Sequence, residues 1–297
     1  MYESFQQLLE SRKLQKAKKV AIIWPFDEHT LEAAKLAVSN IKIDLILIGE
    51  ETELNHRLNE MNFENRPQIL SASNPEDAVH KAIELALNGE VNVLMKGLLE
   101  TSDMMRQMVK KENRMCASGV MSHLSLIELP SYHKLIGVTD CALMTYPTVK
   151  QKGEIIRNSV SFLNSIGINP VKTAVLAAVE KLNPKMPETI DASQLKEEWL
   201  LGEFPGCIIE GPISYDLSIS KEAADIKGYS SEVAGDADLL VVPNIVAGNI
   251  LVKSLTLSAC GFGATMVLGA KVPIVVTSRS SSIKTKYNSL CVASSII

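Results

Sequence analysis

Short apolar runs alternate along the chain with longer segments of helical period. The apolar runs lie at residues 20–24, 44–48, 91–95, 134–138, 173–179, 207–210, 238–242 and 273–277. Most of them are continuous stretches of Val, Ile, Leu and Ala, which is typical of parallel strands covered by helices on both faces. The pattern therefore predicts an α/β fold, with mostly parallel sheets whose strands are joined by crossover helices.

The segment that begins at Asn74 gives the clearest helix signal. Asn74 can cap the helix, Pro75 suits the first helical position, and Gly89 can end it. A second, longer helix is predicted to begin near Pro147 and to end at Gly167.

A length of 297 residues favours about two domains. No repeat, low-complexity tract or Gly/Ser linker marks a boundary, so we place the division by topology. We expect one α/β/α domain from residues 1–145 plus 265–297 and a second from residues 146–264.

The composition, 46% hydrophobic and 22% charged, is that of a globular protein. A net charge of -4 without clustered Lys and Arg gives no reason to expect a nucleic-acid or membrane partner. The N-terminus lacks the apolar core of a signal peptide. Residues 254–270 are uncharged but shorter than the roughly 20 residues that cross a bilayer, so we expect a buried helix that leads into a strand. We therefore expect a cytoplasmic protein.

Several kinds of chemistry find no support in the sequence. The 5 cysteines lie far apart and form no CxxC pair, which argues against disulfides and a zinc site and fits a reducing compartment. The 5 histidines show no metal-ligand spacing, so no metal is expected. Walker A, GxSxG, HExxH and GxGxxG motifs are absent, so ATP, serine-hydrolase, zinc-protease and dinucleotide functions are not indicated.

Polar segments follow the predicted strands. They lie at residues 95–102, 180–187, 210–212, 243–249 and 277–280. Open α/β sheets bind ligands beyond the carboxyl ends of their strands, where loops diverge and helix N-termini present free N–H groups. We therefore expect these segments to line one cleft.

Two of these segments suit an oxyanion. Thr101 and Ser102 stand where a helix should begin, so hydroxyls, backbone N–H groups and the helix dipole would favour phosphate, although either residue can also be a simple cap. Ser278 and Arg279 offer a hydroxyl beside a guanidinium, which can bind a tetrahedral anion in a bidentate way. A lone Ser-Arg pair is also a common surface feature.

The same segments carry short phrases that run in one order along the chain. They are MKGL at 95–98 with Thr101, MSH at 121–123, VEKLNPKMP at 179–187 with Asp191-Ala192, GP at 211–212, SEVAGDAD at 231–238, PNIVAGN at 243–249 and TSR at 277–279. In this combination the sequence resembles the phosphate acetyl/butyryltransferase family, and its butyryl branch more than its acetyl branch.

The resemblance implies two α/β/α domains around an interdomain cleft, similar to isocitrate and isopropylmalate dehydrogenases, in dimers or larger homo-oligomers. It implies reversible transfer of a short acyl group, butyryl or acetyl, between CoA and inorganic phosphate. Acyl-CoA, phosphate and acyl phosphate would be the small-molecule substrates, and no metal or bound cofactor would be required.

The resemblance also assigns roles to residues by matching position. Ser278 and Arg279 would be the catalytic pair that binds phosphate and stabilises the transition state. The residues that bind phosphate, acyl group and CoA would be Lys96, Gly97, Thr101, Ser102, Asn183, Lys185, Gly211, Pro212, Asn244, Gly248 and Asn249.

The base that would activate the CoA thiol stays open. Members of the family commonly carry acidic residues after the Ser-Arg pair and before Gly-Asn, where this chain has Ser281, Lys284 and Val246. The remaining carboxylates near strand ends are Glu180, Glu210, Asp140 and Asp238. Either one of them acts, or the charge of Arg279 lowers the thiol pKa, or activity is weak.

Two alternatives remain at this point. The missing acidic residues are compatible with a non-catalytic protein that binds CoA or acyl phosphate. An oxidoreductase on the related fold would need a nicotinamide site and a carboxylate cluster for a metal, and neither is visible.

Overall fold

The computed structural model describes residues 2–12, 17–63 and 65–295. It has the α/β architecture that the sequence predicts, with mostly parallel strands. The described residues form two compact units: unit 1 comprises residues 2–8 and 122–263, and unit 2 comprises residues 9–12, 17–63, 65–121 and 264–295. The domain boundaries at 145 and 265, the interdomain cleft and the dehydrogenase-like arrangement stay predictions.

The sheet strands of unit 2 follow the order β3-β2-β1-β4-β11-β10. Their bounds are β1 (Lys18–Ile23), β2 (Ile43–Gly49), β3 (Gln68–Ser71), β4 (Val93–Lys96), β10 (Phe262–Leu268) and β11 (Ile274–Val275). All neighbours are parallel except β10 and β11, which are antiparallel. The chain steps from β1 outward to β3 and then returns past β1 to β4, and right-handed crossovers therefore place helices on both faces.

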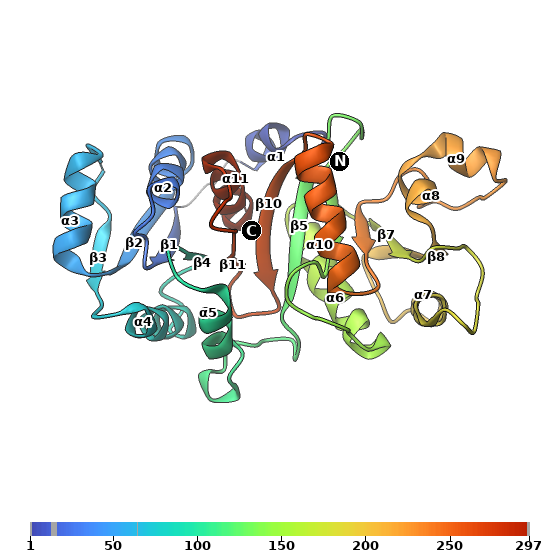
Figure 1. Ribbon diagram of the computed structural model, residues 1–297, viewed down its shortest axis with the longest axis horizontal. Helices are drawn as coiled ribbons and strands as arrows, with labels where there is room; N and C mark the ends of the chain where they lie inside the picture. The colour runs from blue at the N-terminus through green and yellow to red at the C-terminus, as the bar shows by residue number, and fades with distance from the viewer. Residues whose placement is uncertain (1, 13–16, 64, 296–297) are drawn as a thin grey trace. The chain divides into compact units, whose positions relative to one another are not determined.

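Four of the helices of unit 2 pack in two pairs. The helices of this unit are α2 (Glu28–Asn40), α3 (Glu51–Glu60), α4 (Pro75–Leu87), α5 (Thr101–Met108), the short 3₁₀ turn η1 (Lys111–Asn113) and α11 (Ile283–Ser294). Figure 1 shows α2 beside α11 and α4 beside α5. As predicted, Asn74 caps α4 by accepting a hydrogen bond from Asp77 N, Pro75 takes the first helical position, and the left-handed Gly89 follows its end.

The strands of unit 1 follow the order β5-β6-β9-β7-β8. Their bounds are β5 (Ser122–Glu128), β6 (Ile136–Thr139), β7 (Val171–Leu176), β8 (Cys207–Ile213) and β9 (Leu239–Val241). Only the β5–β6 pair is antiparallel, so β6, β9, β7 and β8 end at one common edge. A buried cluster that includes Ile127, Ile136, Ala174, Ile213 and Leu240 forms a core on these strands.

Helices connect these strands. They are α6 (Val149–Ser165), α7 (Pro187–Leu200), α8 (Tyr215–Ile219), α9 (Lys221–Ile226) and α10 (Ile245–Lys253), which continues as the π-turn η2 (Ser254–Ser258); the N-terminal helix α1 (Phe5–Ser11) begins in this unit. The helix predicted near Pro147 is α6, which Thr148 and Gln151 open with a capping box. Gly167, its predicted end, is left-handed with φ of 93°.

The prediction for residues 254–270 was wrong in part. Only Ser254–Ser258 are helical, and Leu257 there is 78% exposed rather than buried, whereas Phe262–Leu268 form strand β10. Gly261 allows the tight turn between them, because a Cβ there would stand 2.8 Å from the Leu255 carbonyl oxygen. None of the helices in the described part of the chain has the length and apolar character that crossing a bilayer requires.

Candidate active site

The carboxyl ends of β1, β4 and β11 lie side by side in unit 2, because β4 pairs in parallel with both other strands. The segments that follow β4 and β11 are two of those in which the sequence predicts chemistry. They meet in the structure: Nη2 of Arg279 lies 2.6 Å from Oε1 of Glu100. The structure thus brings Arg279 to the residue that directly precedes Thr101.

Lys96, the last residue of β4, is buried with 2% of its surface exposed. Its ammonium donates to the carbonyl oxygens of Gly97, at 3.2 Å, and Leu99, at 3.1 Å. Burial lowers the pKa of Lys96 to about 8, and the nearby positive charge of Lys286 acts in the same direction. Lys96 therefore holds the β4–α5 turn and keeps a positive charge below it at neutral pH.

Gly97 is required by close packing of the chain on itself. A Cβ at this position would stand 2.4 Å from the carbonyl oxygen of Trp24. The amide of Gly97 donates to Ile23 O at 2.9 Å, and the amide of Leu98 donates to Trp24 O at 2.7 Å. The turn after β4 is thereby fastened to the end of β1.

Thr101 and Ser102 open helix α5, as predicted, but neither is its cap. The N-cap is Glu100, whose side chain makes no capping hydrogen bond. At the same position of α3, Glu50 accepts hydrogen bonds from the amides of Thr52 and Glu53. The α5 N-terminus is thus left without a side-chain cap, and its N–H groups and dipole favour an anion.

Ser278 and Arg279 lie in the turn between β11 and α11. The hydroxyl of Ser278 is 3.0 Å from that of Ser280, and the side chain of Arg279 is 60% exposed. The pair thus stands at the same edge as the start of α5, with its polar atoms open to solvent.

Sequence reasoning missed a second buried lysine in this region. Lys286 of α11 is 2% exposed, and its ammonium lies 3.4 Å from the carboxylate of Asp27 and 3.0 Å from the hydroxyl of Thr30. Among Lys96 and the four charged side chains that act on it, Lys96, Lys286 and Arg279 carry three positive charges against two on Asp27 and Glu100, an excess of one positive charge. This balance suits an added anion.

In unit 1, the predicted residues after β9 lie on helix α10. Asn244 caps the helix by accepting hydrogen bonds from Val246 N and Ala247 N, both at 3.1 Å. Gly248 is buried against the chain that follows β6, while Asn249 beside it is exposed. The segment thus lies at the carboxyl end of its strand, as predicted.

The predicted segment after β7 forms a turn that is held by hydrogen bonds. The side chain of Asn183 accepts a hydrogen bond from Lys185 N at 3.0 Å, and the amide of Asn183 donates to the Thr189 hydroxyl at 2.9 Å. Lys185 itself is exposed. Asn183 thus shapes the turn, and Lys185 is presented at its surface.

Gly211 and Pro212 were expected after a strand that ends at residue 210, and this placement was wrong. Strand β8 runs to Ile213, so both residues lie inside it, near its carboxyl end. A Cβ on Gly211 would stand 2.9 Å from Cβ of Val175 and 3.2 Å from Cβ of Ala192. Close packing of β8 on β7 and α7 accounts for this glycine.

Three of the carboxylates considered as bases already have partners near the carboxyl ends of the strands. Asp140 accepts hydrogen bonds from the amides of His123, Ala142 and Leu143. Glu210 pairs with Lys196 and also accepts from the Tyr229 hydroxyl. Glu180 accepts from the Ser214 hydroxyl and pairs with Lys227, and the Ser214 bond first of all lowers its pKa, which makes it a weaker base.

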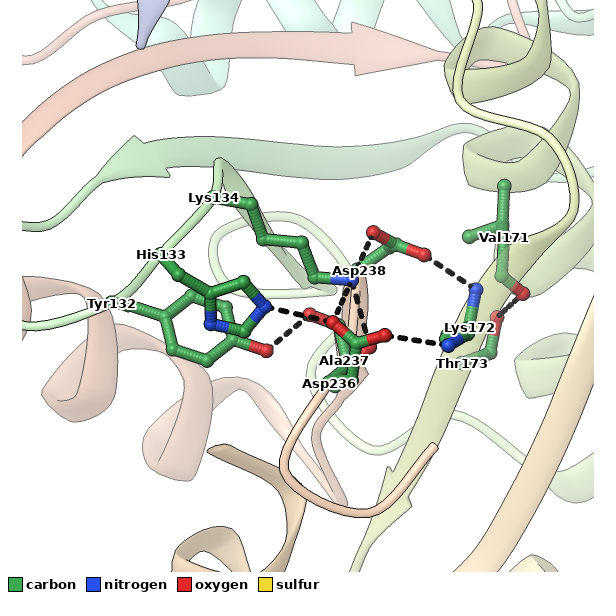
Figure 2. A network of polar contacts seen from close by, with 9 residues as sticks. All are labelled: Tyr132, His133, Lys134, Val171, Lys172, Thr173, Asp236, Ala237 and Asp238. Carbon is green, nitrogen blue, oxygen red and sulfur yellow. Dashed lines mark hydrogen bonds and ion pairs between the residues drawn. The ribbon is translucent and has the colours of Figure 1, made fainter. Parts of the chain in front are cut away.

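The fourth, Asp238, lies at the amino end of β9, opposite the edge where Asn244 lies. Its carboxylate is 2.7 Å from the ammonium of Lys134, and both side chains are 1% exposed. It also accepts from the amide of Lys172 at 2.8 Å, and Asp236 joins the same network (Figure 2). Asp238 is thus a buried ion-pair partner. Across residues 2–12, 17–63 and 65–295, no group of three or more His, Cys, Asp and Glu side chains could hold a metal ion.

Comparison with known proteins finds a matching family model and similar proteins with related names. A family model described as "Phosphate acetyl/butaryl transferase" matches residues 65–294. The chain is 37% identical to the phosphate butyryltransferase of Clostridium acetobutylicum, over 99% of this chain and 98% of that protein. It is 36% identical to the phosphate acetyltransferase of Thermotoga maritima, over 94% of this chain and 95% of that one.

Solved structures of phosphotransacylases are also similar to this chain. A branched-chain phosphotransacylase from Enterococcus faecalis V583 superposes with a TM-score of 0.84 at 32% identity, covering 94% of this chain and 98% of the other. A phosphotransacetylase from Streptococcus pyogenes, at 21% identity and a TM-score of 0.81, shares the fold. Since the family model and these relatives cover most of its length, the chain belongs to the phosphate acetyl/butyryl transferase family.

Proposed function

We propose that the chain is a phosphate acyltransferase that moves a short acyl group, butyryl or acetyl, reversibly between CoA and inorganic phosphate. Family membership makes it an acyltransferase. The observation in the structure that supports phosphate as a substrate is the site around Arg279, where cations outnumber anions beside the uncapped start of α5. CoA acts as a substrate, and we propose that no bound cofactor is required.

In the proposed mechanism, Ser278 and Arg279 are the catalytic pair. The Ser278 hydroxyl and the guanidinium bind the phosphate oxygens, and Arg279 stabilises the negative charge that develops as phosphate attacks the thioester. In the reverse direction the CoA thiolate attacks the acyl phosphate. Reaction is direct between the two substrates, so holding them in line supplies much of the acceleration, and no covalent enzyme intermediate forms.

The remaining residues bind the substrates. We assign Lys96, Gly97, Thr101 and Ser102 to phosphate, since they form the turn after β4 and the first turn of α5. We assign the rest of the predicted set to the acyl group and CoA: Asn183, Lys185, Gly211, Pro212, Asn244, Gly248 and Asn249. In this set Asn183, Gly211 and Gly248 shape the backbone, whereas Lys185 and Asn249 present exposed polar groups.

The thiol of CoA has an ordinary pKa near 8.5, so its ionisation at neutral pH needs a base or a positive field. The carboxylates of Asp140, Glu210 and Asp238 already form hydrogen bonds or ion pairs with neighbouring groups of the protein. We therefore propose that the positive field around Arg279 favours the thiolate. We further propose a cytoplasmic homo-oligomer.

A thiol-release assay tests this function. The chain is incubated with acetyl-, propionyl-, butyryl- or isobutyryl-CoA, with and without phosphate, and free thiol is measured. We expect phosphate-dependent release with at least one of these substrates. Tight CoA binding with no turnover across all four would contradict the proposal and favour a non-catalytic binding protein, which the enzyme names of the relatives do not support.

A further inference from the structure

The ion pair between Glu100 and Arg279 has a consequence for phosphate binding that rests on the function proposed above. We propose that Glu100 is an internal competitor for Arg279: its carboxylate occupies the guanidinium in the free protein, and phosphate must displace it. Glu100 thus sets how strongly the site binds phosphate, without taking part in the chemistry.

The geometry suits a reversible pair. Oε1 of Glu100 lies 2.6 Å from Nη2 of Arg279, a distance typical of a charge-assisted hydrogen bond. The two side chains are 61% and 60% exposed, so either can exchange its partner for water or for an anion without repacking a core. Because exposed ion pairs are weak, phosphate can displace this carboxylate at a small cost in affinity.

A comparison with helix α3 shows that Glu100 does not cap its own helix, although it occupies the N-cap position. Glu50 occupies the N-cap of α3 and uses both carboxylate oxygens to accept from Thr52 N and Glu53 N. Glu100 has the same position at α5 and the same side chain, yet it makes no capping bond and reaches Arg279 instead. The Glu100 carboxylate is thus directed to the guanidinium and not to the amides of its own helix.

Electrostatics give the direction of the effect. Phosphate near neutral pH carries between one and two negative charges, which Glu100 repels and Arg279 attracts. While Glu100 is paired, its negative charge offsets part of the attraction of Arg279 for phosphate. Removing the carboxylate charge should therefore release the guanidinium for phosphate and raise the affinity of the site.

The first test measures KM for phosphate with butyryl-CoA in the full-length Glu100→Gln variant. Glutamine keeps the size of the side chain and a hydrogen-bond acceptor but has no charge. We expect KM to fall by about two- to tenfold at low ionic strength, and the difference from the native chain to shrink in high salt. An unchanged or raised KM overturns the proposal, and a raised KM would mean that Glu100 positions Arg279 for phosphate.

Asp103→Asn is the matched control. Asp103 lies in the first turn of the same helix and pairs with Arg106 at 3.2 Å, not with Arg279. The variant removes one negative charge from the same helix end, so it reports any general electrostatic effect. We expect its KM for phosphate to stay within about twofold of the native value. A decrease equal to that of Glu100→Gln would contradict a specific role of the ion pair.

A second readout does not depend on turnover. Phenylglyoxal modifies accessible arginines, and peptide mapping reports the rate at Arg279 alone. We expect faster modification in Glu100→Gln than in the native chain and in Asp103→Asn, and protection by phosphate in all three. Equal rates in all three overturn the proposal. If the native chain showed no turnover, the proposed function would fail, while these rates would still decide whether Glu100 competes for Arg279.

Discussion

Gly248 of helix α10 lies directly against the backbone of Asp140, where a Cβ on Gly248 would stand 2.8 Å from the Asp140 carbonyl oxygen. The same Cβ would stand 2.8 Å from Cα of Cys141. Helix α10 can therefore approach the end of β6 only with glycine at this position. This contact fixes where Asn244 and Asn249, which we assign to substrate binding, are presented.

Gly248→Ala should therefore destabilise the protein. We expect a loss of about 1–3 kcal/mol in the free energy of unfolding, because the backbone atoms that the new methyl group meets cannot move aside as a flexible side chain can. Urea unfolding of the native chain and the variant measures this loss of unfolding free energy. Under the proposed function, KM for CoA should also rise.

Gly153→Ala in α6 is the control, since Gly153 is also a helical glycine. A Cβ there would meet nothing closer than 3.4 Å, the distance to Nη1 of Arg157, which is ordinary contact. Because alanine has the higher helix propensity, stability should be unchanged or higher by up to about 1 kcal/mol. Equal losses in both variants would show that the approach to Asp140 is not what requires Gly248.

Asp236 is expected to stabilise unit 1 through its ion pairs with His133, Lys134 and Lys172, at the amino end of β9 (Figure 2). Burial raises the pKa of this carboxyl group, but hydrogen bonds from Lys134, Lys172 and His133 outweigh it and hold the pKa well below its usual range. Asp236→Asn should therefore cost about 1–3 kcal/mol at neutral pH, while KM for phosphate stays unchanged.

The pH dependence of this loss has a defined sign. A carboxyl group whose pKa is lowered by folding stabilises the folded state above its unfolded pKa of about 3.9, and this contribution is lost as the pH falls further. The difference in unfolding free energy between native chain and variant should thus narrow below about pH 4. A difference that stays constant there would contradict the role of the charged carboxylate.

The buried charge of Lys96, unlike that of Asp236, should destabilise the folded chain, and this effect should disappear at alkaline pH. Its pKa of about 8 in the folded chain is below the ordinary 10.5, so between these values the unfolded chain binds more protons. The buried charge lowers the free energy of unfolding by its full amount below pH 8, and this loss of stability disappears as the pH rises to 10.5. Relative to Lys96→Met, the native chain should gain stability over this window, at a slope of at most about 1.4 kcal/mol per pH unit. Chemical unfolding at several pH values measures this difference, and a flat one would contradict a lowered pKa.

Features of the fold with local causes were predictable from the sequence. Asn74, Pro75 and Gly89 mark the ends of α4 because capping, a fixed φ and a left-handed turn are properties of single residues. The apolar strand segments were found because covered parallel strands are apolar on both faces. The turns after β4 and β11 were located by the same reasoning, since they directly follow such strands.

Features that depend on distant partners were not predictable. Nothing near Lys286 in the sequence indicates that it is buried beside Asp27, because the two residues meet only through packing of α11 on α2. Glu100 resembles an ordinary helix cap until Arg279 is brought to it. Gly211 was read as part of a loop, whereas its reason is close packing on β7 and α7 inside β8.

The rate of phosphate-dependent thiol release in Arg279→Ala tests most directly whether phosphate is bound and activated at the end of β11. Arg106→Ala, which removes an exposed arginine paired with Asp103, is the control. We predict that Arg279→Ala lowers kcat/KM for phosphate by at least about 100-fold, as for the loss of a group that stabilises transition-state charge, while the far-UV spectrum and the control rate stay native. A native rate in Arg279→Ala would contradict the account.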